Sequence, residues 1–158
     1  MPLIVFLVFF ICQPERFGTP AGIMIMLQQS VINSIIGFGL SLNLVIDTWD
    51  FSEGAQLVLA GLIGAYYSQY YGLAGLILIT ILVATLLGAL TGLVYFVFKI
   101  PSIIVTIGMM LVYESIGSLY HGGANVTIDM GISFLGRSPG IFIVGILTYI
   151  LAYVIYHH

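Results

Sequence analysis

Three acidic side chains occur close together in this chain, and carboxylates can bind a cation or relay a proton. Asp47, Asp50 and Glu53 are spaced three residues apart, so on a continuous helix their carboxylates would share one side. That arrangement would favour a cation site or a proton relay. The alternative is a connector at a membrane interface, or a break between two helices, with hydrated carboxylates. The neighbouring Trp49 favours this alternative, because Trp is enriched at membrane interfaces.

Uncharged polar side chains form a second pattern. Gln29, Asn33, Gly37 and Ser41 are each four residues apart, and Ser34 lies beside them, so they share one helix face. Lipid cannot satisfy amide and hydroxyl groups, so this face should point toward other helices. It either holds helices together through hydrogen bonds or lines a polar path for a solute.

Glu114 lies inside an apolar stretch, about one and a half turns before Tyr120. A carboxylate in such a position either has a functional role or extends toward the nearer membrane interface. The sequence leaves both interpretations open for Glu114. The roles of Asp47 and Glu53 are open in the same way.

The chain has no set of residues that would make an enzyme. It lacks a nucleophile with a nearby base, a phosphate-binding Gly-Lys-Ser loop and a His-rich metal motif, because His157 and His158 are adjacent and terminal. We therefore expect no catalytic residues, no metal site and no cofactor bound by this chain. Nucleic acid is also excluded as a partner, since the chain has only three Lys and Arg residues and they are far apart.

The composition is that of an integral membrane protein. Only 6% of the residues are charged and 61% are hydrophobic, which leaves too little polar surface to cover a water-exposed globule. From Gly54 to Phe98 no side chain is charged, and one helix of that length would measure about 68 Å. Because a hydrocarbon core is only about 30 Å thick, the run should cross, turn near residues 66–72, and cross back.

The predicted fold class is therefore all-α, a polytopic membrane protein with about six membrane-spanning helices in one transmembrane domain over residues 1–158. The predicted helices are 1–13, 21–46, 54–70, 73–98, 101–120 and 140–156. A ladder of small residues in the fourth helix should let a neighbouring helix approach closely. Its members are Thr80, Ala84, Gly88 and Gly92.

Several segments resemble, in order, the permease subunits of bacterial sugar ABC importers of the ribose, galactose and xylose type. The most specific is residues 99–111, KIPSIIVTIGMML. The others are PERFGTP at 14–20, Asp50-Phe51-Ser52 with Gly54, and Phe134-Leu135-Gly136. The resemblance covers nearly the whole chain.

The resemblance implies a multi-pass permease in the bacterial inner membrane that conducts a small polar solute, with a monosaccharide as the first candidate. It implies as partners a second permease subunit, two cytoplasmic ATPase subunits, an extracytoplasmic solute-binding protein and the lipid bilayer. ATP and magnesium would bind to the ATPase subunits. It also implies that residues 1–158 are the N-terminal half of a longer permease, and that residues 121–138 lie outside the cell.

The chain departs from that family at three places. Asp47-Thr48 replaces a usual Gly-Gly before Trp49-Asp50, Thr91-Gly92 replaces a frequent Asn-Gly, and Glu114 occupies a position that is often basic. The loss of paired glycines should reduce backbone freedom at a broken helix. Permeases for nucleosides or branched-chain amino acids therefore remain alternatives, as does a small self-contained ion-coupled carrier.

We expect five polar residues to line or gate the solute path, on the basis of their polar placement in or beside apolar spans. They are Gln29, Asn33, Ser34, Asp50 and Thr106.

Overall fold

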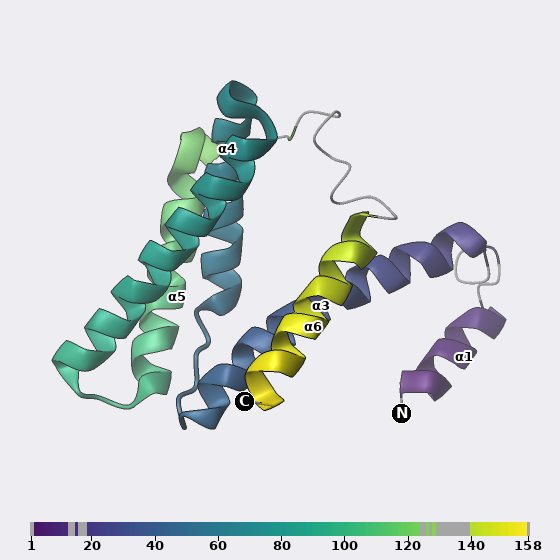
Figure 1. The fold of residues 1–158 in the computed structure, drawn as a ribbon, viewed down its shortest axis with the longest axis horizontal. Helices are drawn as coiled ribbons and strands as arrows, with labels where there is room; N and C mark the ends of the chain where they lie inside the picture. Colours follow the sequence, from purple (N-terminus) through teal and green to yellow (C-terminus); the bar gives the residue numbers. More distant parts are fainter. Residues whose placement is uncertain are drawn as a thin grey trace. The chain divides into compact units, whose positions relative to one another are not determined.

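The computed structural model describes residues 2–12, 15, 19–123, 126, 128 and 140–157. Its elements are α1 (Pro2–Cys12), α3 (Pro20–Val45), α4 (Glu53–Phe98), α5 (Ser102–Leu119), a 3₁₀ turn η1 (Tyr120–Gly123) and α6 (Gly140–His157). Every regular element in this described part is helical, as Figure 1 shows, so the all-α prediction is confirmed there.

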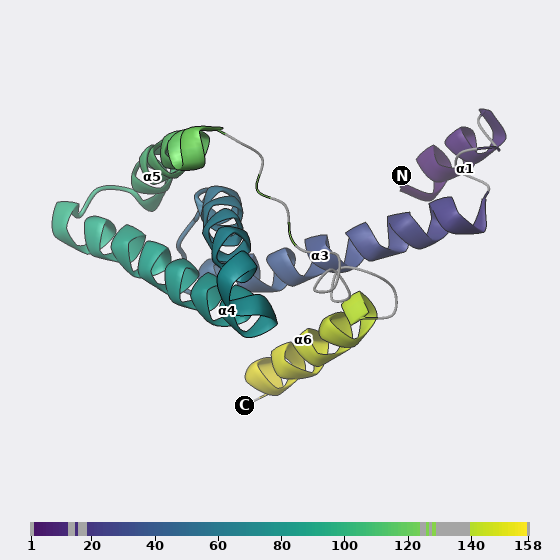
Figure 2. The ribbon, with the colours of Figure 1, turned by 90° about the horizontal axis from the view of Figure 1, so that it is seen from above.

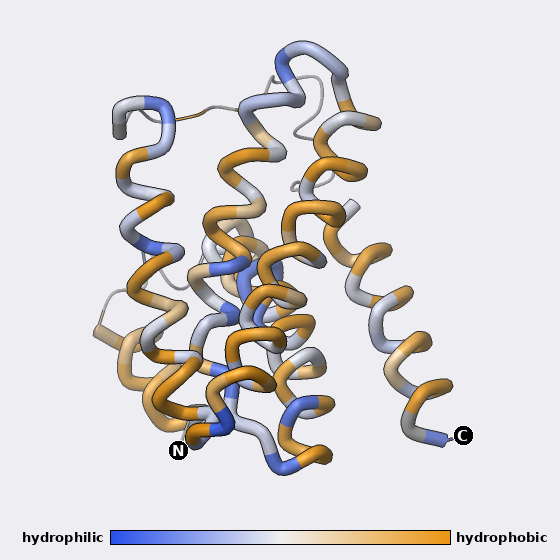
Figure 3. The backbone as a smooth tube through the Cα atoms, turned by 90° about the vertical axis from the view of Figure 1, so that its left-hand side faces the viewer, coloured by the Kyte–Doolittle hydropathy of each residue, from blue (hydrophilic) through white to orange (hydrophobic). Residues whose placement is uncertain are grey.

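Hydrophobic residues dominate the helices, and hydrophilic residues gather at their ends and connections (Figure 3). Three helices are long and apolar enough to cross a membrane: Pro20–Val45, Glu53–Phe98 and Ser102–Gly122. The last helix contributes a shorter apolar stretch, Gly140–Ile155. A membrane-helical protein is consistent with these lengths, whereas the expected number of about six crossings stays a prediction.

The chain forms two compact units. One comprises Met1–Gly37 with Phe134–His158, and the other comprises Phe38–Ser133. In the first unit Val31 of α3 lies so close to Gly145 of α6 that a Cβ at Gly145 would come within 2.6 Å of Val31 Cγ1. The expectation of a single transmembrane domain over 1–158 stays a prediction.

Local sequence explains where α3 begins. Thr19 Oγ1 accepts a hydrogen bond from the Gly22 backbone N–H at 3.1 Å, and the Thr19 carbonyl accepts one from Ile23 N–H. This is the geometry of a helix N-cap. Pro20 follows as the first helical residue, where its missing N–H costs nothing.

The long helix α4 is a hairpin of two helical arms. At Gly72 the backbone adopts φ 61° and ψ −150°, a combination that is accessible essentially to glycine alone. The two arms fold back on each other there, as Figures 1 and 2 show. The predicted turn at the end of residues 66–72, between helices 54–70 and 73–98, is therefore confirmed.

The two arms of α4 pack tightly. Gly64 in the first arm lies against Thr80 in the second, and a Cβ built on Gly64 would collide with the Thr80 hydroxyl. Closer to the open end of the hairpin, Gln56 Oε1 lies 3.5 Å from the Cβ position of Gly88. The two members of each pair are equally far in sequence from Gly72, so the arms run antiparallel and in register.

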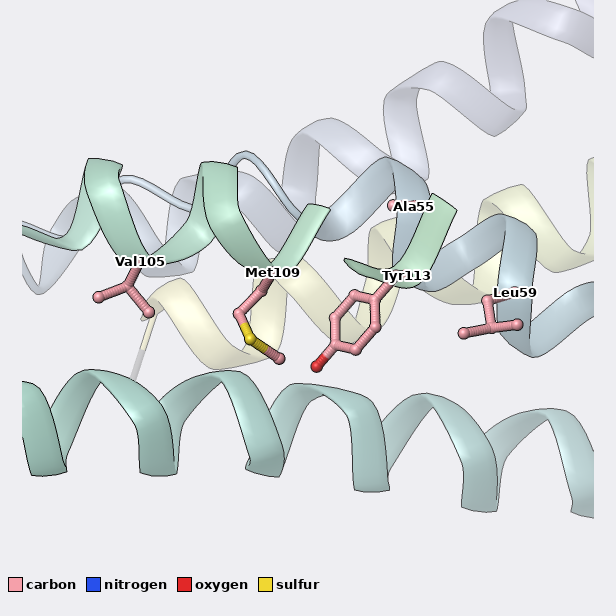
Figure 4. Packing of buried hydrophobic residues seen from close by; sticks show 5 residues of the cluster. All are labelled: Ala55, Leu59, Val105, Met109 and Tyr113. Atoms are coloured by element: carbon pink, nitrogen blue, oxygen red, sulfur yellow. The ribbon is translucent and has the colours of Figure 1, made fainter. Parts of the chain in front are cut away.

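The helix α5 completes this second unit. The Thr106 hydroxyl donates to the Trp49 carbonyl just before the first arm begins, and Tyr66 near the end of that arm packs on Tyr120, with ring centroids 5.9 Å apart. The helix α5 therefore runs in the same direction as the first arm. The core of the unit is the cluster of Ala55, Leu59, Val105, Met109 and Tyr113 shown in Figure 4.

Candidate functional site

A non-helical connector separates α3 from α4. The acidic trio, Asp47, Asp50 and Glu53, therefore does not lie on one continuous helix, and the alternative of a break between two helices is confirmed. The helix α3 ends at Val45 and α4 begins at Glu53. Asp47 follows the end of α3 in a left-handed conformation, with φ 56°. This left-handed region of φ and ψ favours glycine, but Asp and Asn are among the residues that tolerate it. Asp47 therefore adopts a conformation that favours glycine, at the place where Asp47-Thr48 replaces the paired glycines usual in the family.

Asp50 organises the start of α4. Its Oδ1 accepts hydrogen bonds from the Ser52 backbone N–H at 2.7 Å and from the Ser52 hydroxyl at 2.6 Å. Ser52 is completely buried. An Asp side chain that bonds to the backbone two residues later forms a local turn, so Asp50 fixes how the chain enters the first arm.

The hydrogen bonds continue from this turn into the interior. Gln56 Nε2 donates to Ser52 Oγ at 2.6 Å and, more weakly, to Thr91 Oγ1 at 3.4 Å on the second arm. Thr91 Oγ1 in turn lies 2.9 Å from the Tyr113 hydroxyl of α5. We call this set of Asp50, Ser52, Gln56, Thr91 and Tyr113 the Gln56 network.

The inner end of the Gln56 network is buried. Thr91 is 4% exposed and Tyr113 is 1% exposed. The Tyr113 hydroxyl donates to the Leu87 carbonyl at 2.7 Å, and Figure 4 shows it pointing toward the second arm of α4. A buried polar network of this kind is stable only when each member has a partner. It joins the connector, both arms of α4, and α5.

Thr106 reaches the same connector from α5. Its hydroxyl donates to the Trp49 carbonyl at 3.2 Å, and the Trp49 backbone N–H donates to the Ser102 hydroxyl, also at 3.2 Å. Because Trp49 precedes Asp50 in the chain, the structure brings two of the expected path residues, Asp50 and Thr106, to one connector.

Glu53 has a partner of its own and does not join the other carboxylates in a shared site. Asn43 Nδ2 of α3 donates to Glu53 Oε1 at 2.8 Å, which ties the end of α3 to the start of α4. Within the residues that the structure describes, no three His, Cys, Asp or Glu side chains gather as metal ligands would. The arrangement of the trio therefore gives no support to a cation site.

The other three expected path residues lie in the first unit. Gln29, Asn33 and Ser34 are all exposed on α3. The Ser34 hydroxyl donates to the Ser30 carbonyl at 2.8 Å within the same helix. The structure therefore gathers these three on one helix, and it does not place them relative to Asp50 and Thr106.

The small-residue ladder lies on the second arm of α4. Thr80 contacts Gly64 and Gly88 faces Gln56, so these two members lie at the interface between the arms. Ala84 is half-buried, whereas Gly92 is exposed with open space at its Cβ position.

Sequence reasoning missed the residues that carry the Gln56 network inward. Thr91 was noted only as a departure from a family pattern, and Gln56, which shares the uncharged run with one other amide, Gln69, was not singled out. An amide in an apolar helix is a usable signal, because lipid offers it no hydrogen bond. Tyr113 carried no comparable signal, since aromatic residues occur throughout the chain.

Comparison with known proteins gives one informative match. The chain is 30% identical over 115 residues to the ribose import permease RbsC of Haemophilus influenzae. The match covers 72% of this chain and 35% of that protein, so the chain spans about a third of the relative's length. No family model and no solved structure matches. With its long apolar helices, the chain is thus similar to an import permease, the class that the sequence resemblance indicated.

Proposed function

We propose that this chain is part of the transmembrane permease subunit of an ATP-driven importer, and that it lines the path of a small polar solute. The observation that carries this proposal is the similarity to a ribose import permease over 115 residues. The long apolar helices and the hydrogen-bonded network inside them support it, because polar groups within spans commonly mark solute paths.

A monosaccharide is the proposed solute, and a full transporter is the proposed setting. The partners would be a second permease subunit, two cytoplasmic ATPase subunits and an extracytoplasmic solute-binding protein in the bacterial inner membrane. ATP and magnesium would bind to the ATPase subunits. Transport against a gradient then requires those subunits, whose ATP hydrolysis would drive alternating access through the permease.

Two polar surfaces of the chain would contact or gate the solute. Gln29, Asn33 and Ser34 present exposed amide and hydroxyl groups on one helix. Asp50 and Thr106 hold the connector between α3 and α4 in place. The Gln56 network joins that connector to three helical segments, so we expect them to move together when access alternates.

Uptake into proteoliposomes tests the proposal. The intact permease is reconstituted with its ATPase and solute-binding partners, and uptake of radiolabelled D-ribose is measured with and without ATP inside. We expect uptake only with ATP, and competition by unlabelled pentoses. Competition by nucleosides or branched-chain amino acids instead would change the assigned solute. Uptake driven by an ion gradient without the ATPase would overturn the importer assignment.

Alanine replacement of Gln29 and Asn33 tests the path assignment separately. We expect the double variant to lower the maximal uptake rate or raise the half-saturation concentration. Thr148→Ala is the matched control, because the Thr148 hydroxyl lies in the same unit and, among the described residues, bonds to the Val144 carbonyl of its own helix. If the double variant behaved like this control, Gln29 and Asn33 would not belong to the path.

A further inference from the structure

A hollow of about 440 Å³ lies between the first arm of α4 and α5, within the second unit. Its lining includes Gly54 and Ala55 at the start of the arm and Gly117 on α5. The small size of these residues leaves the hollow open. Small-molecule sites commonly measure roughly 300–1,000 Å³, so this hollow has the size of a site for a single small molecule.

Glu114 lines the hollow and gives it a charge. It lies about 18 Å along α5 from Ser102, close to the middle of a hydrocarbon core about 30 Å thick. No group among the described residues forms an ion pair or hydrogen bond with its carboxylate. A carboxylate at that depth faces protein or a water-filled cavity, because hydrocarbon does not solvate it.

The other groups around the hollow define the ligand chemistry. Ser118 lines it as well, and its hydroxyl donates to the Glu114 carbonyl, which leaves its oxygen free to accept. The Tyr113 hydroxyl is occupied by Thr91 and Leu87, so Tyr113 offers its apolar ring. Carboxylate and hydroxyl acceptors beside a ring favour a ligand with several hydroxyl donors and an apolar face.

We propose that this hollow is a solute subsite for a polyhydroxylated molecule of monosaccharide size, whose hydroxyls donate to the Glu114 carboxylate. The proposal rests on the proposed function as a solute permease and adds the residue that binds the solute. A carboxylate can accept hydrogen bonds from hydroxyl donors at both oxygens. Glu114 would therefore bind the solute hydroxyls more strongly than a neutral hydroxyl or amide at this position would.

Thiol labelling tests whether the hollow contains water. Cys12 is the single cysteine among these 158 residues, so Cys12→Ser, with Ser also at every cysteine elsewhere in the intact permease, gives a clean background. In this background Gly117→Cys places a thiol in the hollow. Ser115→Cys is the matched control at nearly the same depth, roughly 200° away around the helix. We expect N-ethylmaleimide to label Gly117→Cys much faster, because maleimide reacts with a hydrated thiolate.

Protection by D-ribose tests the ligand. We expect D-ribose to slow labelling of Gly117→Cys in the intact permease, and glycine betaine at equal concentration to leave it unchanged. Adding Glu114→Gln should raise the D-ribose concentration that gives half-maximal protection about tenfold, as expected for the loss of a charge-assisted hydrogen bond. Glu114→Asp, which keeps the carboxylate, should retain part of the protection.

The outcomes separate this subsite from the proposed function. Equal labelling of both cysteines, or protection that is unchanged by Glu114→Gln, would overturn the subsite even if ATP-dependent uptake were normal. Absence of ATP-dependent uptake together with fast labelling at Gly117→Cys that D-ribose slows would instead overturn the importer while leaving the subsite intact.

Discussion

At the scale of single residues, backbone conformation and hydrogen bonding decide what individual side chains do. Asp47 adopts φ 56° at the end of α3, a region that costs a residue with a Cβ roughly 1 kcal/mol. The adjacent backbone is well bonded, since the Thr48 N–H donates to the Asn43 carbonyl at 3.0 Å. The connector is therefore held in place despite this cost.

We predict that Asp47→Gly stabilises the protein by up to about 1 kcal/mol, because glycine adopts this conformation without a steric penalty. Unfolding by SDS titration, followed by circular dichroism, measures the change. Asp47→Val should destabilise the protein, since a β-branched residue is strongly disfavoured at positive φ. A glycine variant less stable than the original would show that the carboxylate contributes more than the backbone conformation costs.

Tyr113 is the residue that closes the Gln56 network. Its hydroxyl bonds to Thr91 and to the Leu87 carbonyl while its ring packs in the core beside Leu59 and Met109. One side chain therefore supplies both the polar and the apolar contact between α5 and the hairpin.

We predict that Tyr113→Phe lowers the free energy of unfolding by about 0.5–2 kcal/mol, because it keeps the ring and removes the buried hydroxyl. Tyr71→Phe is the control, since Tyr71 is 68% exposed. The same SDS titration measures both variants. Equal effects from the two would mean that the buried hydrogen bonds contribute no net stability.

At the scale of elements, the hairpin of α4 depends on two glycines for different reasons. Gly72 makes the turn, because only glycine readily adopts its backbone angles. Gly64 permits the arms to touch, because any Cβ there meets Thr80. The ladder member Thr80 thus packs closely because its neighbour on the opposite arm is Gly64. The spacing of the ladder residues alone does not identify this neighbour.

We predict that Gly64→Ala destabilises the hairpin by about 1–3 kcal/mol through overpacking. Gly61→Ala, three residues earlier in the same arm, should be neutral or slightly stabilising. Its Cβ position is open, and Ala favours a helix by up to about 1 kcal/mol over Gly. Thermal unfolding in detergent compares the two.

The double variant Gly64→Ala with Thr80→Ala provides a further check. It should recover part of the stability, because it removes the hydroxyl that collides with the new methyl group. If Gly64→Ala and Gly61→Ala had the same effect, the arms would not be packed as described.

At the scale of the whole molecule, the hairpin sets the topology in the membrane. The first arm is about 28 Å long and the second about 39 Å, so each is long enough to cross a hydrocarbon core. The Tyr-rich end of the hairpin and the segment after Phe98 should then lie on opposite sides of the membrane.

We predict that Tyr71→Cys and Ile100→Cys, each in the Cys12→Ser background, react from opposite sides with a membrane-impermeant maleimide. Tyr71→Cys should be labelled in intact cells and Ile100→Cys only after the membrane is opened. Both positions are exposed, at 68% and 40%, so access within the protein does not limit the reaction. Labelling of both from one side would exclude a second crossing.

The sequence was sufficient for properties that depend on local composition. The scarcity of charge and the length of the uncharged run from Gly54 to Phe98 predicted a helical membrane protein with a hairpin. The hairpin follows from the length of a membrane span, which requires no knowledge of neighbouring helices. The resemblance at residues 99–111 likewise indicated the class of the relative that the comparison found.

Only the tertiary structure decided which polar groups meet. Asp50 and Thr106 share a connector, and Gln56, Thr91 and Tyr113 form one network, although they belong to segments far apart in the chain. Such hydrogen bonds depend on the rotation and axial register of each helix, and a sequence pattern shows only which residues share a face of one helix. The helix face of Gln29 and Asn33 was visible in the sequence for that reason, whereas the partners of Gln56 were not.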